Sequence, residues 1–268
     1  MSAAARLSAV LLLALVLAVS CAPAWAEPER VIDVPTRPGV SERLLFIATP
    51  NAKATVILFA GGHGGLRLAP DGKIGWGAGN FLVRTRQMLA AQSVNVATLD
   101  APSDRQGEPF LNGFRQTREH AADVKAVIAT LRQQQAGVPV WLMGTSRGTQ
   151  SVAYLATELP RDAGGPDGVV LTSTILTERR GSRAVPGMPL QFIKVPVLVV
   201  HHKDDGCDHC RYTDLPLLTE KLTAAPRKEV IVVEGGATRG DPCEAFAHHG
   251  YNGIEQDVIT KIAAWIVR

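Results

Sequence analysis

The sequence predicts an α/β fold, in which a mostly parallel central sheet is flanked by helices on both faces. Short apolar segments alternate with longer amphipathic segments from residue 54 to the end of the chain. The short segments are apolar throughout rather than at every second residue, as strands are when both faces of a parallel sheet are buried. The chain has 268 residues, and a length of this order suits one large domain over residues 27–268.

Strands are predicted where apolar residues run continuously between turn-forming residues. The run ATVILFA ends in a glycine-rich loop, VNVATLD ends in Ala-Pro-Ser-Asp, and VPVLVVHH is rich in β-branched residues. The predicted strands cover residues 43–47, 54–60, 94–100, 138–144, 168–173, 195–202 and 229–235.

Helices are predicted between these strands, where apolar residues recur at helical spacing. Residues 116–135 show the pattern most clearly, with Ala121, Val124, Ile128 and Leu131 on one face. Residues 174–194 form the longest irregular stretch, which suffices for a short flap but not for a cap domain. The predicted helices cover residues 79–92, 116–135, the segment from Ser146 to about Leu159, residues 213–224 and residues 252–267.

Residues 1–26 have the layout of a secretory signal peptide. Arg6 precedes an apolar run, and Ala24-Trp25-Ala26 supplies the small residues of a cleavage site. The apolar run is too short for a membrane span. We expect cleavage after Ala26 and a periplasmic or extracellular protein; lipidation at Cys21 is a less favoured alternative.

The charge and composition argue against two classes of partner. A net charge of +3, spread along the chain, predicts neither nucleic-acid binding nor attachment to a membrane surface. With 46% apolar residues, the chain can bury an ordinary globular core.

The stretch WLMGTSRGTQ, residues 141–150, contains a Gly-x-Ser-x-Gly motif at the junction of a predicted strand and a predicted helix. In this context the motif forms a sharp turn that exposes the serine hydroxyl, and glycines on either side relieve crowding. The first helical turn also offers free N–H groups and a positive dipole end. These features predict Ser146 as a nucleophile.

A serine nucleophile needs a histidine base and a carboxylate that orients it. At a turn of this kind the chain order is serine, acid, histidine. Asp204 and Asp205 directly follow the strand 195–202. His248 and His249 lie between the last predicted strand and the last predicted helix. The order is therefore satisfied, while the choice within each pair stays open at this point.

With these motifs the chain resembles the α/β-hydrolase fold family over roughly residues 40–268. It looks closest to compact, capless members near dienelactone hydrolases and small secreted serine esterases. In such families the acid lies four residues after a histidine, as Asp205 does after His201. The family's base often precedes glycine and an aromatic residue, as His249 does. The resemblance therefore implies a triad of Ser146, Asp205 and His249.

Acyl transfer also needs N–H donors for the oxyanion. One is expected from the backbone of Arg147, the residue after the nucleophile. The other is expected from the loop GGHGG, residues 61–65, with His63 preferred and Gly62 as the alternative. Although this loop follows a strand, it lacks the lysine of a P-loop and the spacing of a dinucleotide-binding fingerprint.

Three cysteines remain after the expected cleavage, Cys207, Cys210 and Cys243. An oxidising compartment favours a disulfide. We expect Cys207–Cys243, which ties the acid loop to the histidine loop, with Cys210–Cys243 as the alternative. A redox-active C-x-x-C or a zinc site is less favoured, because a single C-x-x-C pair is weak evidence for either.

These observations predict a secreted serine hydrolase that cleaves small or polymeric carboxylic esters through an acyl-enzyme. An amidase or peptidase with the same triad is one alternative, and a catalytically silent binding protein on the same scaffold is another. A serine mechanism requires neither a metal nor an organic cofactor, and we expect none.

Overall fold

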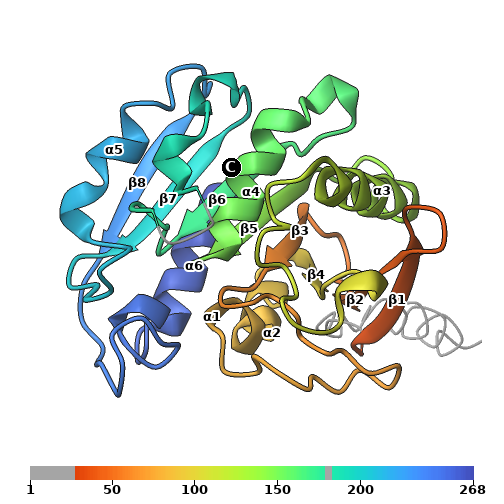
Figure 1. The fold of residues 1–268 in the computed structure, drawn as a ribbon, viewed down its shortest axis with the longest axis horizontal. Helices are drawn as coiled ribbons and strands as arrows, with labels where there is room; N and C mark the ends of the chain where they lie inside the picture. Colours follow the sequence, from red (N-terminus) through yellow and green to blue (C-terminus); the bar gives the residue numbers. More distant parts are fainter. Residues whose placement is uncertain (1–27, 179–182) are drawn as a thin grey trace, which may run out of the picture.

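A single eight-stranded sheet organises the computed structural model, which describes residues 28–178 and 183–268 (Figure 1). The predicted signal peptide, residues 1–26, lies outside the described residues. The strand order is β1-β2-β4-β3-β5-β6-β7-β8. Neighbouring strands are parallel from β4 to β8, whereas β2 is antiparallel to both β1 and β4. The strands are β1 Arg30–Pro35, β2 Ser41–Ile47, β3 Ala54–Phe59, β4 Val94–Leu99, β5 Val140–Thr145, β6 Gly168–Thr172, β7 Val197–His202 and β8 Lys228–Val233.

All of the predicted strands are present, and β1 is an addition that the sequence analysis did not predict. The segment RVIDVP mixes charged and apolar residues, and only Val34 among them is fully buried. It lies at the edge of the sheet, where one side of the strand has no neighbour. A strand of this kind lacks the continuous apolar run by which the buried strands are recognised.

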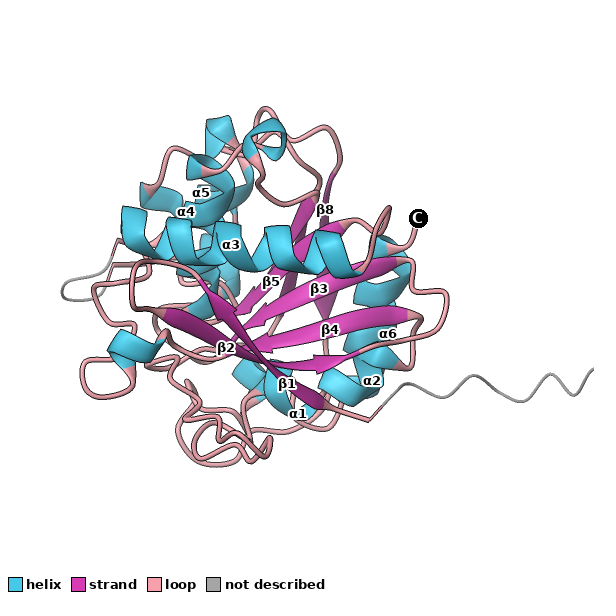
Figure 2. Ribbon diagram, turned by 90° about the vertical axis from the view of Figure 1, so that its right-hand side faces the viewer, coloured by secondary structure: helices cyan, strands magenta, loops and turns pink. Residues whose placement is uncertain are grey.

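Helices cover both faces of the sheet, as Figure 2 shows edge-on. Residues of α3 and α4 pack on one face, and those of α1, α2 and α6 pack on the other. The helices are α1 Phe81–Arg84, α2 Arg86–Ala90, α3 Arg118–Gln134, α4 Gly148–Glu158, α5 Pro216–Thr219 and α6 Glu255–Ile266.

Two predicted helices differ from the observed ones. The helix predicted over residues 79–92 is interrupted at Thr85, whose hydroxyl donates to the Phe81 carbonyl and which separates α1 from α2. The helix predicted over residues 213–224 shortens to α5, preceded by a 3₁₀ turn. Pro216 has no backbone N–H, so it fits the first position of α5 rather than the interior of a longer helix.

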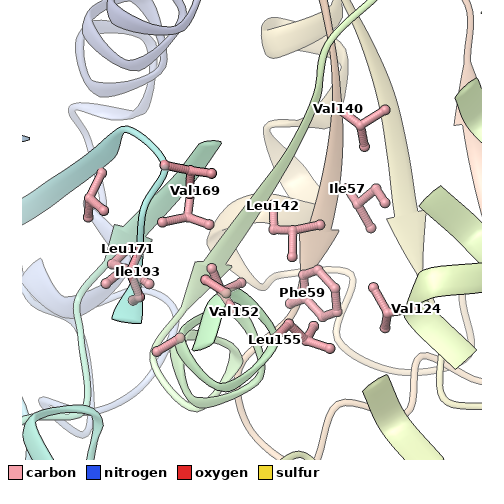
Figure 3. Packing of buried hydrophobic residues seen from close by; sticks show 14 of the residues in the cluster. Ile57, Phe59, Val124, Val140, Leu142, Val152, Leu155, Val169, Leu171 and Ile193 are labelled. Carbon is pink, nitrogen blue, oxygen red and sulfur yellow. The ribbon is translucent and has the colours of Figure 1, made fainter. Parts of the chain in front are cut away.

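Alternate residues of the central strands supply the core on each face. Figure 3 shows Ile57 and Phe59 of β3 and Leu142 of β5 facing Val152 and Leu155 of α4. The residues between them along β3 and β5 point to the opposite face and pack with α6. β8 departs from the expectation that the strands are buried throughout, because it is an edge strand and most of its residues are exposed.

The described part of the connection from β6 to β7 carries no cap. In this part, residues 173–178 and 183–196, helical structure is limited to the 3₁₀ turns Val185–Gly187 and Leu190–Phe192. Across residues 28–178 and 183–268, no helix combines the length and the apolarity needed to cross a bilayer.

The contrast between central and edge strands yields a prediction of stability. Val199→Ala in β7 removes two methyl groups from a fully buried side chain and should lower the free energy of unfolding by roughly 1.5–3 kcal/mol. Val230→Ala in β8 is the matched control, because that side chain is 38% exposed, and it should change the free energy by less than about 0.5 kcal/mol. Urea unfolding measures both, and equal losses would contradict the assigned burial.

Candidate active site

The turn from β5 into α4 holds Ser146 in a strained conformation. Its φ is +52°, in the left-handed region that residues with a side chain rarely adopt. The Ser146 N–H donates to the Thr172 carbonyl at 3.0 Å, which ties the turn to β6. Strain of this kind persists only where the surroundings enforce it.

The two glycines of the motif are required by close backbone packing. A Cβ on Gly144 would lie 2.5 Å from the Gly148 carbonyl oxygen. A Cβ on Gly148 would lie 2.0 Å from the carbonyl oxygen of Phe59, at the end of β3. Both distances are shorter than any real Cβ contact, so only glycine lets α4 start this close to β3 and β5.

Asp205 and His249 meet at the same edge of the sheet, on the loops that follow β7 and β8. Asp205 Oδ2 accepts a hydrogen bond from His249 Nδ1 at 2.9 Å, and both side chains are buried. Asp205 Oδ1 accepts from the Cys207 N–H at 3.0 Å, which fixes the carboxylate. A carboxylate at Nδ1 favours the tautomer with its hydrogen there, which leaves the Nε2 lone pair free.

A cavity of about 340 Å³ lies beside these residues. Ser146 and His249 both line it, together with Arg147, Trp76, Ile175 and the Cys207–Cys243 disulfide. His249 Nε2 is buried and has no hydrogen-bond partner among the described residues. A buried nitrogen acceptor without a donor is costly unless something that enters the cavity satisfies it.

A second layer of hydrogen bonds, which the sequence analysis did not identify, fixes the backbone of His249. Ser173 Oγ, just after β6, donates to the His249 carbonyl at 2.6 Å. The Tyr251 hydroxyl donates to the Val200 carbonyl at 2.8 Å and accepts from the Ser173 N–H at 3.0 Å. Burial raises the pKa of Tyr251 well above its ordinary value, so the hydroxyl remains a donor. The aromatic residue after His249-Gly250 was the one signal in the sequence.

Asp204 and His248 lie outside this pair. The His248 ring stacks on His202 with centroids 4.3 Å apart, and its Nδ1 lies 3.2 Å from the Asp204 carbonyl oxygen. These three residues also bring together groups that can ligate a metal. His202 Nε2 already pairs with the Gly235 carbonyl and its Nδ1 accepts from the Asp204 N–H, so the cluster does not fit a metal site.

The loop after β3 contributes Gly61 and Gly62 to the cavity lining, whereas His63 is not among the lining residues. The His63 ring lies between Trp76 and Phe110, with centroid distances of 3.7 and 4.2 Å, and its Nδ1 accepts from the Gly65 N–H. Burial lowers the pKa of His63. The imidazole therefore packs between two aromatic rings and does not line the cavity.

The predicted disulfide joins Cys207 to Cys243, and Cys210 is a buried free thiol whose pKa is raised by burial. The alternative pairing, Cys210–Cys243, is not formed. A zinc set of the three cysteines and a histidine does not fit, because two of the sulfurs are bonded to each other.

Solved structures share this architecture at low sequence identity. A cold-adapted esterase from an Arctic intertidal metagenomic library matches 89% of this chain and 96% of its own, with a TM-score of 0.60 and 16% identity. Dienelactone hydrolase from Anabaena variabilis matches 89% and 96%, with a TM-score of 0.62 and 13% identity. An α/β serine hydrolase without a lid from Xanthomonas campestris matches 90% and 98%, with a TM-score of 0.55 and 14% identity. The chain has the α/β-hydrolase fold. No protein-family model and no curated protein matches the sequence.

The α/β-hydrolase fold explains why residues so far apart in the chain meet. Parallel strands place their carboxyl ends at one edge of the sheet, and ligand sites of open α/β sheets form there. Ser146 follows β5, Asp205 follows β7 and His249 follows β8. This is the chain order of serine, acid and histidine that the fold uses.

The disulfide closes a loop between Cys207 and Cys243 and should support both stability and geometry. The double variant Cys207→Ser/Cys243→Ser should lose roughly 2–4 kcal/mol of unfolding free energy, because the unfolded chain gains freedom. Any ester turnover should fall as well, since a small displacement of either loop separates Asp205 from His249. Denaturant unfolding and steady-state kinetics measure the two effects.

The control for this experiment is Cys210→Ser, which leaves the disulfide in place and should have the smaller effect on both measurements. Peptide mapping of non-reduced protein supplies the direct check. A free Cys243 thiol in that map would contradict the pairing.

Proposed function

We propose that the chain is a serine hydrolase that cleaves carboxylic esters, with Ser146 as nucleophile, His249 as base and Asp205 as the residue that orients it. One observation carries the proposal. The buried Asp205–His249 hydrogen bond leaves His249 Nε2 without a hydrogen-bond partner in the part of the chain that the structure describes, in the same cavity that a strained, glycine-flanked Ser146 lines. A nucleophile, a base and an orienting acid in one cavity are the parts that acyl transfer needs.

In the proposed reaction, Ser146 Oγ forms a bond to the ester carbonyl carbon while its proton passes to His249 Nε2. The carbonyl π electrons move to oxygen and give a tetrahedral oxyanion. His249 then returns the proton to the leaving alcohol as the ester C–O bond breaks, which leaves an acyl group on Ser146. Water repeats the sequence and releases the acid, while Asp205 stabilises the imidazolium at each step.

The oxyanion in this reaction needs two N–H donors. We assign one to the backbone of Arg147, at the start of α4 where the helix dipole is positive. For the second we favour Gly62 over His63, because Gly62 lines the cavity. Gly62 has a φ of +58°, and a Cβ there would lie 2.6 Å from the Trp76 ring, so glycine is needed at this position.

The neighbours with this fold are described as esterases, a dienelactone hydrolase and a serine hydrolase, which supports ester cleavage. An amidase or peptidase would use the same triad and remains the nearest alternative in chemistry. A silent binding protein is disfavoured because the strained Ser146 lines the same cavity as the buried Asp205–His249 pair, and a binding site has no use for that combination.

Export belongs to the same proposal. We propose that residues 1–26 are a signal peptide cleaved after Ala26, that residues 27–268 form the mature domain, and that the protein works in the periplasm or outside the cell. The Cys207–Cys243 disulfide supports this location, because disulfides persist in oxidising compartments.

Ser146→Ala tests the nucleophile directly. Hydrolysis of a chromogenic short-chain ester should fall by roughly 10⁴-fold or more, because the attacking oxygen is gone. The melting temperature should not fall. Ser103→Ala changes an exposed serine remote from the cavity and is the matched control, which should keep full activity. Turnover near the wild-type rate in Ser146→Ala would remove the mechanism.

Asp205→Asn tests the acid. An amide in place of the carboxylate stabilises the wrong tautomer of His249, and kcat should fall by roughly 10⁴-fold. Asp204→Asn is the control one residue away, and because the Asp204 side chain is exposed its effect should be small. If Asp204→Asn has the lower kcat of the two variants, Asp204 and not Asp205 is the residue that orients His249.

A further inference from the structure

A buried cation, Arg115, lies directly beneath the loop that follows β3. It comes from the segment between β4 and α3 and is only 3% exposed. Its Nη2 donates to the carbonyl of Ala60 at 3.0 Å and to that of Gly62 at 3.4 Å. Its Nη1 donates to Ser151 Oγ, in α4, at 3.0 Å. One guanidinium therefore connects the loop after β3 to α4, the helix that begins two residues after Ser146.

The positive charge of Arg115 has no carboxylate partner in ion-pair contact among residues 28–178 and 183–268. Burial, and secondly the nearby charge of Arg147, lower the pKa of Arg115 to about 9, so it remains charged at neutral pH. Burying a charge without a counter-ion opposes folding. Its hydrogen bonds to Ala60, Gly62 and Ser151 offset part of that cost.

The loop is shaped to admit this side chain. A Cβ on Gly64 would lie 2.3 Å from Arg115 Nη2, so any other residue there would displace the guanidinium. At the start of the same loop, a Cβ on Gly61 would lie 3.0 Å from Ser146 Cβ. The loop therefore packs closely against both the buried cation and the proposed nucleophile.

We propose that Arg115 is a positioning residue for the oxyanion-binding loop, which it holds at a fixed place relative to Ser146. The inference rests on the proposed function. The Gly62 N–H belongs to the Gly61–Gly62 peptide, and the two carbonyls that Arg115 binds lie on either side of this peptide along the chain. By holding both carbonyls, Arg115 fixes the direction in which the N–H points. The bond to Ser151 sets the spacing between this donor and the Arg147 N–H at the start of α4.

The positive charge of Arg115 also stabilises the oxyanion directly, in addition to positioning its donors. The tetrahedral intermediate carries a negative charge that the ester lacks, and a buried cation behind the loop favours it. The effect should therefore fall on the transition state and not on the bound ester.

The test compares Arg115→Met, Arg115→Lys and the control Arg118→Met, an exposed arginine three residues along the chain. For a chromogenic ester, kcat of Arg115→Met should fall by roughly 100-fold, the loss typical of one oxyanion donor, with KM little changed. Arg115→Lys should recover part of the loss, because its ammonium keeps the charge but satisfies fewer acceptors. Arg118→Met should match the wild type.

A purely structural role for Arg115 would not move the affinity for a transition-state analogue. The inhibition constant of phenylboronic acid, which forms a tetrahedral anion on an activated serine, should rise in Arg115→Met by the same factor as kcat falls. Inhibition by a neutral aliphatic alcohol, which forms no tetrahedral anion on Ser146, should not change. A folded Arg115→Met with wild-type kcat, or with lower kcat and unchanged boronate affinity, would overturn the inference.

If Arg115→Met fails to fold, Arg115→Lys and Ser151→Ala carry the test. Ser151→Ala removes one acceptor of the guanidinium, and kcat and boronate affinity should then fall together by roughly tenfold. Unchanged values in both variants would overturn the inference. If the wild-type protein shows no ester hydrolysis that depends on Ser146, the proposed function falls, and this inference falls with it. If the wild type is active and the Arg115 variants have the same kcat and boronate affinity, this inference alone is overturned.

Discussion

The close approach of three backbone segments at Ser146 is the constraint on which the rest of the site depends. The end of β3, the end of β5 and the start of α4 meet with no room for a side chain at Gly144 or Gly148. This contact forces Ser146 into a left-handed conformation and brings the loop after β3 alongside it. A single packing contact between backbones thus sets both the exposure of the hydroxyl and the place of the proposed oxyanion donors.

The other half of the site depends on how two loops are tied to the sheet. The Cys207–Cys243 disulfide joins the loops after β7 and β8, and Ser173 and Tyr251 anchor the His249 backbone to the ends of β6 and β7. The Asp205–His249 hydrogen bond is thus held by one covalent restraint, which also lines the cavity, and by hydrogen bonds to the sheet. The geometry of the pair is therefore preorganised, which is the condition for fast proton transfer.

The central strands and the turn at Ser146 could be predicted because each depends on a local signal, whereas the choice of Asp205 and His249 within their pairs came from the family resemblance and stays a prediction. Continuous apolar runs identified the buried strands, and Gly-x-Ser-x-Gly marked the turn at Ser146. The edge strand β1 and the break at Thr85 were missed, since one lacks an apolar run and the other depends on a hydrogen bond to the Phe81 carbonyl. The contacts of Arg115 with the loop after β3 and of the Tyr251 hydroxyl with β7 join residues far apart in the chain, and the sequence hinted only at Tyr251, as the aromatic residue after His249-Gly250.

Labelling with a fluorophosphonate tests most directly whether Ser146 is an activated nucleophile. The reagent phosphonylates serine hydroxyls that have a functioning base and ignores ordinary ones. Intact-mass analysis of wild-type protein should show one phosphonyl group per chain, and peptide mapping should place it on Ser146. Protein that stays unlabelled, or that carries the group on another residue, would contradict the account.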